Sequence, residues 1–516
     1  MNVHSVEQVQ KLTVIAPATG KVIAEIEETP IHEVPLFYQR GRNAFAAWSS
    51  ISIPERLRYF RKLKQLMVDE MDQIARTISE DTGKVLTEAI VADIMPTLDA
   101  IDHIIRHAEK VLSRQKAKTP FLLIGKKSYI EYMPRGIVLV ISPWNYPLQL
   151  AMVPMVSALA GGNTVILKPS EVTPLVGKCI EDLFNRSGFP EGTVQVAHGG
   201  KEVGAAFTEG KPDYIFFTGS VRTGKIIQQQ AARDLIPTTL ELGGKDPMIV
   251  FKDANLERAA KAAAWGAFTN SGQVCMSAER LYVERSISEE FLELLKSEVR
   301  NLTQGTDENA DVGSMTFPAQ KDIVKGQLEE ALARGAKLET GLEPVNWQEG
   351  MFIPLTVVTH VEQDMKIIQE ESFGPLLPVV LFDTEEEAVT LANGTVFGLN
   401  ASVWTKDKEK ARRVASKLVS GAVVINDVII TVANHGLPFG GTKESGIGRY
   451  HAEGGLRIFC HEKAIMEDLG LMNTEIQWYP YKGKYPLFLN LFKNYFGEKR
   501  NWLSFARDYL ALLKSK

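Results

Sequence analysis

The chain has 516 residues, 45% of them hydrophobic and 23% charged, and its formal net charge is −5. A length prior of roughly 150 residues per domain predicts two to four domains. The composition is typical of a soluble α/β protein, and the lack of a basic excess argues against nucleic-acid binding. The three cysteines, at positions 179, 275 and 460, are too widely spaced for a disulfide framework or a zinc cluster. We therefore expect no metal site and a reducing, cytoplasmic compartment.

Along the chain, residues 1–10 show no secretory signal, and residues 12–27 are consistent with a β hairpin. Helical periodicity runs from Pro54 to about Leu112. Residues 121–133 then predict two strands that form a long hairpin, joined at residues 125–127.

The next part of the chain, residues 136–242, alternates strand-like with helical segments, and residues 243 to about 452 do so again. Such alternation predicts parallel sheets with helices on both faces. Ligands of such sheets bind beyond the carboxyl ends of the strands. Polar residues follow several of the predicted strands in the first block, and we expect them to meet in one site: Asn145, Lys168, Glu171, Gly219, Ser220 and Glu241.

Cys275 is the most distinctive of the candidate reactive residues. It stands in the polar segment TNSGQVCMS, directly after a predicted helix over residues 256–268. On this segment alone a nucleophile and a small apolar core residue are equally good interpretations.

A phosphate site is predicted in the segment FTGSVRTGK, where Gly219, Ser220 and Gly224 lie at a turn from strand to helix. Free backbone amides and the helix dipole favour an anion there, although glycines at such turns commonly serve the turn alone. Lys168 and Glu171, in KPSE, suit the two hydroxyls of an adenosine ribose. Glu171 would repel a 2′-phosphate, which favours NAD; a surface ion pair is the alternative.

Three further segments suggest chemistry. Asn145, between two prolines in PWNYP, could donate to an oxyanion or could cap the helix that follows. Glu241 ends an apolar strand in ELGGK, where a raised pKa would suit a general base. Glu371 and Phe373, in EESFGP, could hold a ribose and the nicotinamide end of a cofactor, or could be a solvated acid and a core aromatic.

These strings together resemble the NAD(P)-dependent aldehyde dehydrogenase superfamily. PWNYP, KPSE, FTGS, ELGGK, SGQVC, EESFGP, GAVVIND and LPFGGTKESGIGR occur in the order typical of that family, over roughly residues 12–467. The resemblance implies a Rossmann-like parallel-sheet cofactor domain, an α/β catalytic domain and a protruding β hairpin. It also implies the following parts: residues 1–116 and 136–242 as the cofactor-binding domain, 117–135 as an oligomerisation hairpin, 243–455 as the catalytic domain, 456–470 as an oligomerisation arm and 471–516 as a C-terminal extension.

The resemblance also implies residue roles. Cys275 would attack the aldehyde, Asn145 would stabilise the oxyanion, and Glu241 would activate the water that hydrolyses the thioester. The cofactor would be NAD, with NADP as the alternative, and the protein would form a homodimer or homotetramer. The implied cofactor contacts are Trp144, Lys168, Glu171, Gly219, Ser220, Gly224, Leu242, Glu371 and Phe373.

The last segment, residues 471–516, extends beyond the usual end of such proteins. It holds eight Lys or Arg against three acidic residues, and Trp502, Phe505, Tyr509 and Leu513 share one helical face. Docking on the protein itself or on a partner subunit is the first interpretation, and peripheral contact with a membrane is the alternative. The apolar extension favours a hydrophobic aliphatic or aromatic aldehyde as the substrate.

Two other functions compete with this one. The thioester could be passed to CoA, although enzymes of that kind commonly lack the base at the position of Glu241. The chain could also be an inactive binding protein that keeps the fold. The presence of Cys275, Asn145 and Glu241 argues against it.

Overall fold

The computed structural model describes residues 10–341 and 350–514. Residues 1–9, within which the prediction of no secretory signal falls, lie outside the described ranges. The chain forms two compact units, one of residues 1–113 and 132–462 and the other of residues 114–131 and 463–516. No helix among the described residues is long and apolar enough to cross a membrane. In the same residues, no group of His, Cys, Asp or Glu is arranged to hold a metal ion.

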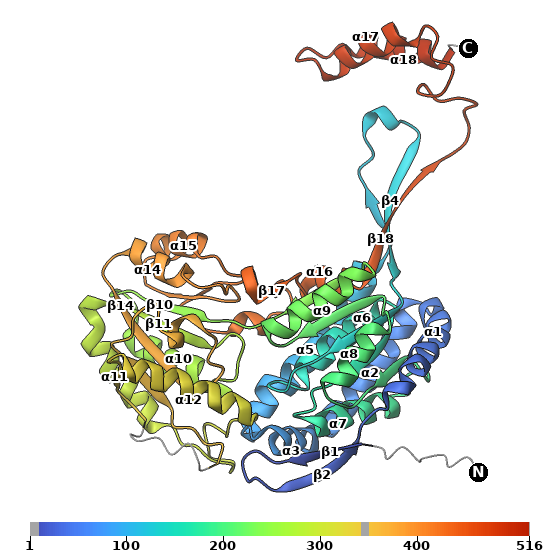
Figure 1. Ribbon diagram of the computed structural model, residues 1–516. Helices are drawn as coiled ribbons and strands as arrows, with labels where there is room; N and C mark the ends of the chain where they lie inside the picture. The colour runs from blue at the N-terminus through green and yellow to red at the C-terminus, as the bar shows by residue number, and fades with distance from the viewer. Residues whose placement is uncertain (1–9, 342–349, 515–516) are drawn as a thin grey trace, which may run out of the picture. The chain divides into compact units, whose positions relative to one another are not determined.

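The larger unit holds a six-stranded sheet in the order β17-β9-β8-β5-β6-β7 (Figure 1). Its parallel strands are β5 (Ile137–Ile141), β6 (Thr164–Lys168), β7 (Val194–Val196), β8 (Tyr214–Thr218) and β9 (Thr238–Glu241). The sixth strand, β17 (Gly446–Ile447), is antiparallel to β9 and places Gly446 opposite Glu241. A segment two hundred residues later in the chain thus completes the sheet beside the predicted base.

Side chains alternate along these strands between two apolar cores. Val138 and Val140 face one core, and Ile137 and Leu139 face the other. Helices cover both faces, as the alternation predicted. They are α1 (Val34–Ser50), α2 (Ile53–Asp69), α3 (Met71–Thr82), α5 (Met95–Leu112), α6 (Gln149–Ala160), α7 (Pro174–Arg186), α8 (Lys201–Glu209) and α9 (Val221–Arg233).

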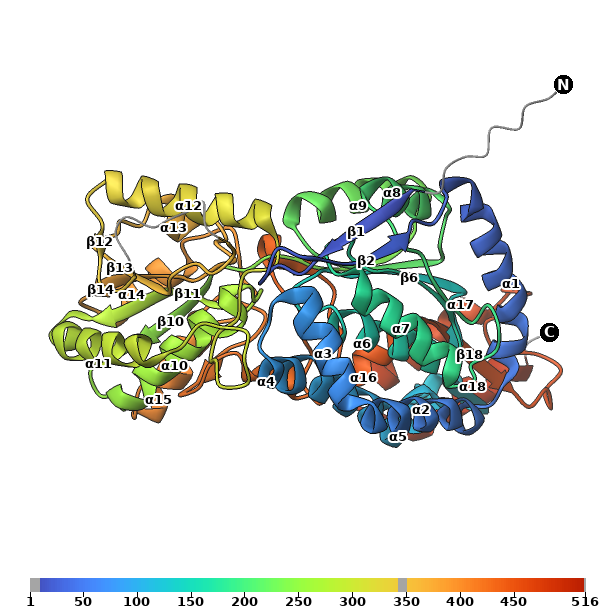
Figure 2. The same cartoon turned by 90° about the horizontal axis from the view of Figure 1, so that it is seen from below.

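A second sheet, of seven strands, has the order β12-β13-β14-β11-β10-β15-β16 and is parallel except at β12 (Figure 2). Its strands are β10 (Asp246–Val250), β11 (Ala278–Glu284), β12 (Lys337–Leu338), β13 (Thr356–Thr359), β14 (Leu376–Phe382), β15 (Ser402–Trp404) and β16 (Val424–Ile425). Its helices are α10 (Leu256–Phe268), α11 (Ser288–Asn301), α12 (Pro318–Ala333), α14 (Glu385–Asn393) and α15 (Lys408–Lys417). The segment that joins β9 of the first sheet to β10 of the second is short and comprises residues 242–245.

The remaining elements of the larger unit include the predicted N-terminal hairpin, β1 (Lys11–Ile15) with β2 (Val22–Glu27), which is confirmed as an antiparallel pair. The short helices are α4 (Leu86–Glu88), α13 (Lys366–Gln369) and α16 (Ala452–Arg457). Helix α8 lies between β7 and β8, and α12 lies between α11 and β12.

The smaller unit corrects the predicted hairpin. Residues 121–123 form a 3-10 turn, and the strand that pairs with β4 (Lys126–Pro134) is β3 (Gln115–Ala117). Apolar character misled the prediction, because Phe121 packs its ring against Tyr495, Trp502 and Phe505 instead of joining a ladder. Strand β18 (Cys460–Asp468) lies on the other side of β4.

The C-terminal extension forms two helices, α17 (Lys484–Phe496) and α18 (Trp502–Lys514). Phe505, with Tyr509 and Leu513 packed around it, shares a small apolar core with Leu491 of α17. This face of α18 therefore docks on the protein itself, which agrees with the first interpretation of the extension.

Candidate active site

A cavity of about 120 Å³ lies beyond the carboxyl ends of β5, β8 and β9. It brings together the predicted nucleophile, oxyanion donor and base with several predicted cofactor contacts. Its lining residues are Pro143, Trp144, Asn145, Leu150, Thr218, Gly219, Ser220, Glu241, Leu242, Gly243, Cys275, Gln320, Glu371 and Phe373. Of the predicted site residues, Lys168, Glu171 and Gly224 do not line it.

The segment that carries Cys275 is held in an unusual backbone conformation. Asn270 and Ser271, directly after α10, have φ values of 50° and 55°. Glu88 stabilises this turn by accepting the Asn270 amide N–H at 2.8 Å and the Thr269 hydroxyl at 2.7 Å. Strained backbone of this kind concentrates at functional sites because surrounding contacts must maintain it.

The Cys275 thiol is only partly buried and lines the cavity. Burial, followed by the nearby carboxyls of Asp246, Glu371 and Glu241, raises the pKa of Cys275 above its usual value. The thiol is therefore harder to deprotonate than a free cysteine, and forming the nucleophilic thiolate requires a proton acceptor.

Asn145 is fixed beside the nucleophile. Its side-chain amide donates to the Gln273 carbonyl at 3.0 Å, two residues before Cys275. Buried Lys84 donates to the Asn145 carbonyl at 2.9 Å and pairs with Asp93 at 2.5 Å. Helix α6 has no side-chain cap, so the capping alternative for Asn145 is wrong.

Glu241 is the most unusual ionisable group of the cavity. The residue is only 3% exposed, and both of its carboxylate oxygens are buried without a hydrogen-bond partner. Burial raises the pKa of Glu241 well above its usual value, and the charge of Arg449 opposes this. A Cβ on Gly440 would lie only 2.8 Å from Oε1, so glycine leaves the space that the carboxylate occupies. A buried, unpaired carboxyl in the same cavity as a thiol is the combination expected of a general base.

The predicted phosphate turn has the geometry of an N-terminal helix site. Ser220 is the N-cap of α9, where its hydroxyl accepts the Thr223 amide. A Cβ on Gly224 would overlap the Leu242 side chain, so Gly224 allows α9 to pack closely on the segment after Glu241. The first amides of α9 beside this turn suit a phosphate.

Lys168 and Glu171 form an ion pair at 2.7 Å at the end of β6, with the lysine almost fully buried. Glu171 remains open to solvent on the same edge of the sheet as the phosphate turn. The pair leaves carboxylate oxygens available to ribose hydroxyls. It fits both the surface ion pair and the ribose contact that the sequence suggested.

Glu371 and Phe373 lie on a loop before β14. A Glu371 carboxylate oxygen accepts the Gly244 amide at 2.9 Å, and burial followed by Glu279 raises the pKa of Glu371 to about 8. Phe373 packs edge-to-face on Trp144, with ring centroids 5.3 Å apart. Both residues are half-buried and line the cavity.

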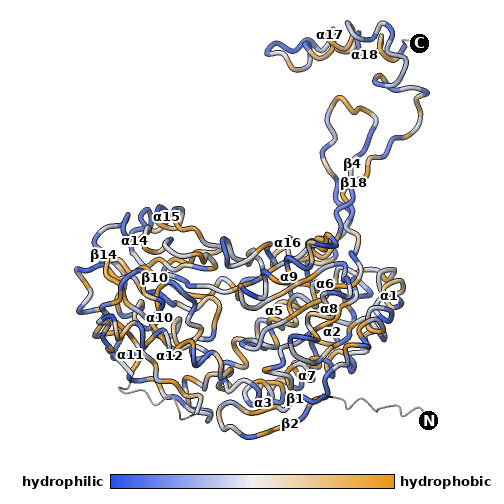
Figure 3. Tube along the Cα trace, viewed as in Figure 1, coloured by the Kyte–Doolittle hydropathy of each residue, from blue (hydrophilic) through white to orange (hydrophobic). Residues whose placement is uncertain are grey.

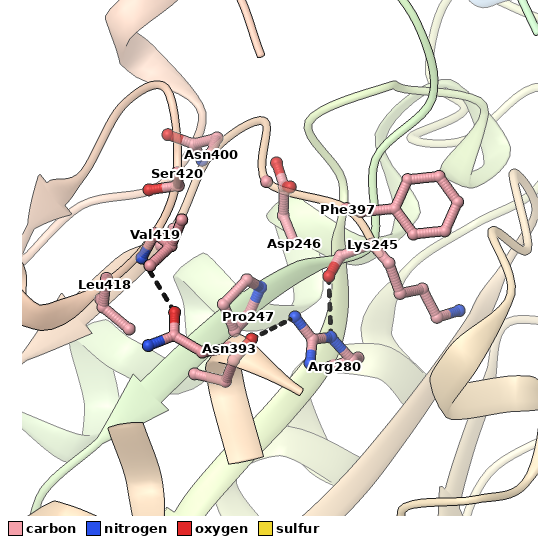
Figure 4. Close-up of a pocket in the computed structure, with 13 residues that line it drawn as sticks. Lys245, Asp246, Pro247, Arg280, Asn393, Phe397, Asn400, Leu418, Val419 and Ser420 are labelled. Carbon is pink, nitrogen blue, oxygen red and sulfur yellow. Dashed lines mark hydrogen bonds between the residues drawn. The ribbon is translucent and has the colours of Figure 1, made fainter. Parts of the chain in front are cut away.

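A buried polar network, which the sequence did not suggest, connects this loop to the segments that carry Cys275 and Glu241. Glu279, four residues after Cys275, accepts the amides of Ser372 at 2.7 Å and Phe373 at 2.9 Å. It also pairs with Lys245, four residues after Glu241, at 2.7 Å. Arg280 donates to the Lys245 carbonyl at 2.7 Å, as Figure 4 shows. The local sequence around Glu279 and Lys245 gave no indication that the two side chains form a buried ion pair.

Gly244 provides a test of how closely these segments must fit. An added Cβ would overlap the backbone carbonyl of Cys275, which cannot move aside as a side chain could. We expect Gly244→Ala to lower kcat/KM about 10²-fold by displacing the thiol. Gly326→Ala is the matched control, because its Cβ would meet open space. Steady-state kinetics and thermal melting of both variants measure the effect, and normal kinetics in Gly244→Ala would contradict it.

The fold is that of the aldehyde dehydrogenases, and the chain belongs to the aldehyde dehydrogenase family, whose model matches residues 4–465. It is 42% identical over 474 residues to the 4,4'-diapolycopene aldehyde oxidase of a Methylomonas species, which covers 91% of this chain and 88% of that protein. It is 35% identical over 471 residues to a betaine aldehyde dehydrogenase of Vibrio vulnificus, covering 90% of this chain and 96% of that one.

Solved structures of relatives agree. The betaine aldehyde dehydrogenase of Staphylococcus aureus in complex with NAD+ has a TM-score of 0.85 at 32% identity, over 91% of this chain and 94% of that one. An NADP-dependent enzyme of E. coli also has a TM-score of 0.85, at 30% identity, over 89% of this chain and 95% of that one. The protein is therefore an oxidoreductase of this family.

Proposed function

We propose that the chain oxidises a hydrophobic aliphatic or aromatic aldehyde to its carboxylic acid through a thioester on Cys275. The observation that carries this proposal is the pairing of the Cys275 thiol with the unpartnered Glu241 carboxyl in one cavity. A silent binding protein would have no need to retain a buried carboxyl without partners, because such a group destabilises the fold.

In the proposed reaction, the Cys275 thiol loses its proton to solvent water, with Glu241 as the alternative acceptor, and the sulfur bonds to the aldehyde carbon. The carbonyl oxygen becomes an oxyanion, which the Asn145 side-chain amide and the Cys275 backbone amide stabilise. After oxidation to the thioester, the deprotonated Glu241 removes a proton from water, which attacks the acyl carbon. The acid is released, and Glu241 gives this proton to the leaving Cys275 sulfur, which restores the thiol and the carboxylate. NAD(P), when bound, would supply this oxidation as a hydride acceptor.

The residues present fit such a dinucleotide. The Ser220 turn and the α9 amides would hold its phosphates, Lys168 and Glu171 one ribose, and Glu371 the other. Glu171, still solvent-exposed beside Lys168, would repel a 2′-phosphate, which favours NAD over NADP. Relatives with either cofactor are known, so both belong in the test.

The substrate class rests on the cavity and on the relatives. Among the lining residues that are not assigned to the cofactor, Pro143 and Leu150 are apolar and Gln320 is polar without a charge. The relative at 42% identity is named for an aldehyde of diapolycopene, and others at 35% are named for betaine aldehyde. No Lys or Arg lines the cavity to bind a substrate carboxylate.

The deciding experiment is a steady-state panel with NAD and with NADP. It compares C2 to C12 aldehydes, aromatic aldehydes, betaine aldehyde and a semialdehyde. We expect kcat/KM to rise with chain length and to be highest with NAD. A preference for betaine aldehyde or the semialdehyde would overturn the substrate class, and acid formation only with added CoA would overturn the hydrolytic reaction.

Asn145→Ala tests the oxyanion donor. We expect kcat to fall about 10²- to 10³-fold, because one such donor contributes about 2.7 to 4 kcal/mol to the transition state. The surrounding structure should persist, since Asn270 also donates to the Gln273 carbonyl, at 3.2 Å. A loss of kcat below fivefold, measured alongside an unchanged melting temperature, would show that another group holds the oxyanion.

The compartment and assembly are part of the same proposal. Cys179, Cys275 and Cys460 are all free, which suits a reducing cytoplasm. We expect a homodimer or homotetramer formed through residues 117–135 and 456–470. Light scattering would measure the stoichiometry, and a monomeric mass would contradict this assembly.

A further inference from the structure

Helix α17 presents an apolar stripe that nothing in its own unit covers. Tyr485, Leu489, Phe492 and Phe496 recur at intervals of four, three and four residues, so they share one helical face. They are 77%, 44%, 42% and 69% exposed. Leu491, on another face, is fully buried in the core shared with α18. The stripe is thus additional to the face that holds the two helices together.

More exposed aromatic residues lie just before this helix. Trp478, Tyr479 and Tyr481 precede α17 and are 55%, 80% and 58% exposed. Figure 3 shows apolar and polar residues interspersed along α17 and α18. Trp and Tyr at the edge of an apolar surface are typical of the boundary between water and lipid. Exposed aromatic residues both on a helix face and in the segment before it suit lipid better than a paired helix.

The positive charge of the C-terminal extension also favours a lipid surface. Residues 471–516 hold eight basic and three acidic residues, while the whole chain has a net charge of −5. Lys482, Lys493 and Lys499 are exposed next to the aromatic residues. A second copy of the chain would present the same positive charge, so like charges would oppose pairing of two stripes. An anionic lipid surface would attract this segment and repel the acidic remainder.

We propose that the α17 stripe binds an anionic membrane surface, with the aromatic side chains at the level of the lipid headgroups. The helix is too short to span a bilayer, and an amphipathic helix with basic flanks lies in the plane of the interface. The contact does not depend on the reaction chemistry. Its consequence for the proposed function is that an apolar aldehyde dissolved in lipid reaches an enzyme held at that surface.

Sedimentation of the full-length protein with vesicles tests the contact. Vesicles of phosphatidylcholine with one quarter phosphatidylglycerol are compared with pure phosphatidylcholine. We expect binding to the anionic vesicles, and at least a tenfold lower partition coefficient for Leu489→Ser/Phe492→Ser. Val68→Ser/Leu235→Ser, which removes two exposed aliphatic residues elsewhere, should bind like the wild type. For Lys482→Gln/Lys499→Gln we expect the partition coefficient to fall about fivefold for each charge removed, and only on anionic vesicles.

The proposal would be overturned if the wild type did not sediment with anionic vesicles, or if Leu489→Ser/Phe492→Ser bound them as well as the wild type does. It would also be overturned if light scattering gave this variant a lower oligomeric mass than the wild type. The last result would assign the stripe to contact between copies. Turnover of a water-soluble aldehyde separates this test from the enzymatic one. It should be equal in the wild type and Leu489→Ser/Phe492→Ser, and its absence from both would count against the proposed function without altering the vesicle result.

Discussion

Cys275→Ala is expected to lower kcat for aldehyde oxidation by at least about 10⁴-fold, because removal of a nucleophile abolishes the covalent route. The change deletes one sulfur from a cavity wall, so folding and NAD affinity should be close to those of the wild type. Steady-state kinetics measure the loss of turnover, and fluorescence measures the affinity for NAD. Mass spectrometry detects the acylated protein. No substrate adduct should form on the variant.

The other two cysteines are the matched controls. Cys179 is partly buried in α7 and Cys460 is buried at the start of β18, and neither lines the cavity. Cys179→Ala should keep normal turnover, and it provides the same chemical change away from the site. Full dehydrogenase and esterase activity in Cys275→Ala would refute the nucleophile assignment.

The convergence of the site residues could be predicted because topology alone brings them together. Asn145, Ser220 and Glu241 each follow a parallel strand, and the carboxyl ends of such strands share one edge of the sheet. The role of Cys275 was harder to predict, since its segment was equally compatible with a small apolar core residue. Its role depended on the resemblance and on ELGGK some thirty residues earlier.

The surroundings of the base could not be predicted in this way. Strand β17 is two residues long, too short for any periodic pattern, yet it places Gly446 opposite Glu241. Gly440 lies against the carboxylate from the same late segment. The sequence marked LPFGGTKESGIGR as characteristic, but local patterns carry no information about a contact across two hundred residues. The same holds for the pair of Lys245 and Glu279, because a buried ion pair resembles a solvated one until the strands are placed.

The largest effect after loss of the thiol is expected in Glu241→Gln. If Glu241 activates the hydrolytic water, this variant should release about one equivalent of NADH per chain in a burst. Its steady state should then be about 10²- to 10⁴-fold slower than that of the wild type, because the thioester accumulates. Hydroxylamine should restore turnover, since a stronger nucleophile needs no base. Stopped-flow absorbance measures both phases, and Glu209→Gln, at an exposed position, is the control.

The pH dependence separates the two roles of Glu241. Its pKa is raised by burial, and a base acts only when deprotonated, so wild-type turnover should fall as pH drops through that raised pKa. The steady state of Glu241→Gln should lack this limb. A missing burst would place Glu241 before the thioester, as the group that takes the Cys275 proton. A normal burst with normal turnover would exclude both roles of Glu241. Another base would then have to activate the water. The other carboxyl that lines the cavity belongs to Glu371, and it already accepts the Gly244 amide.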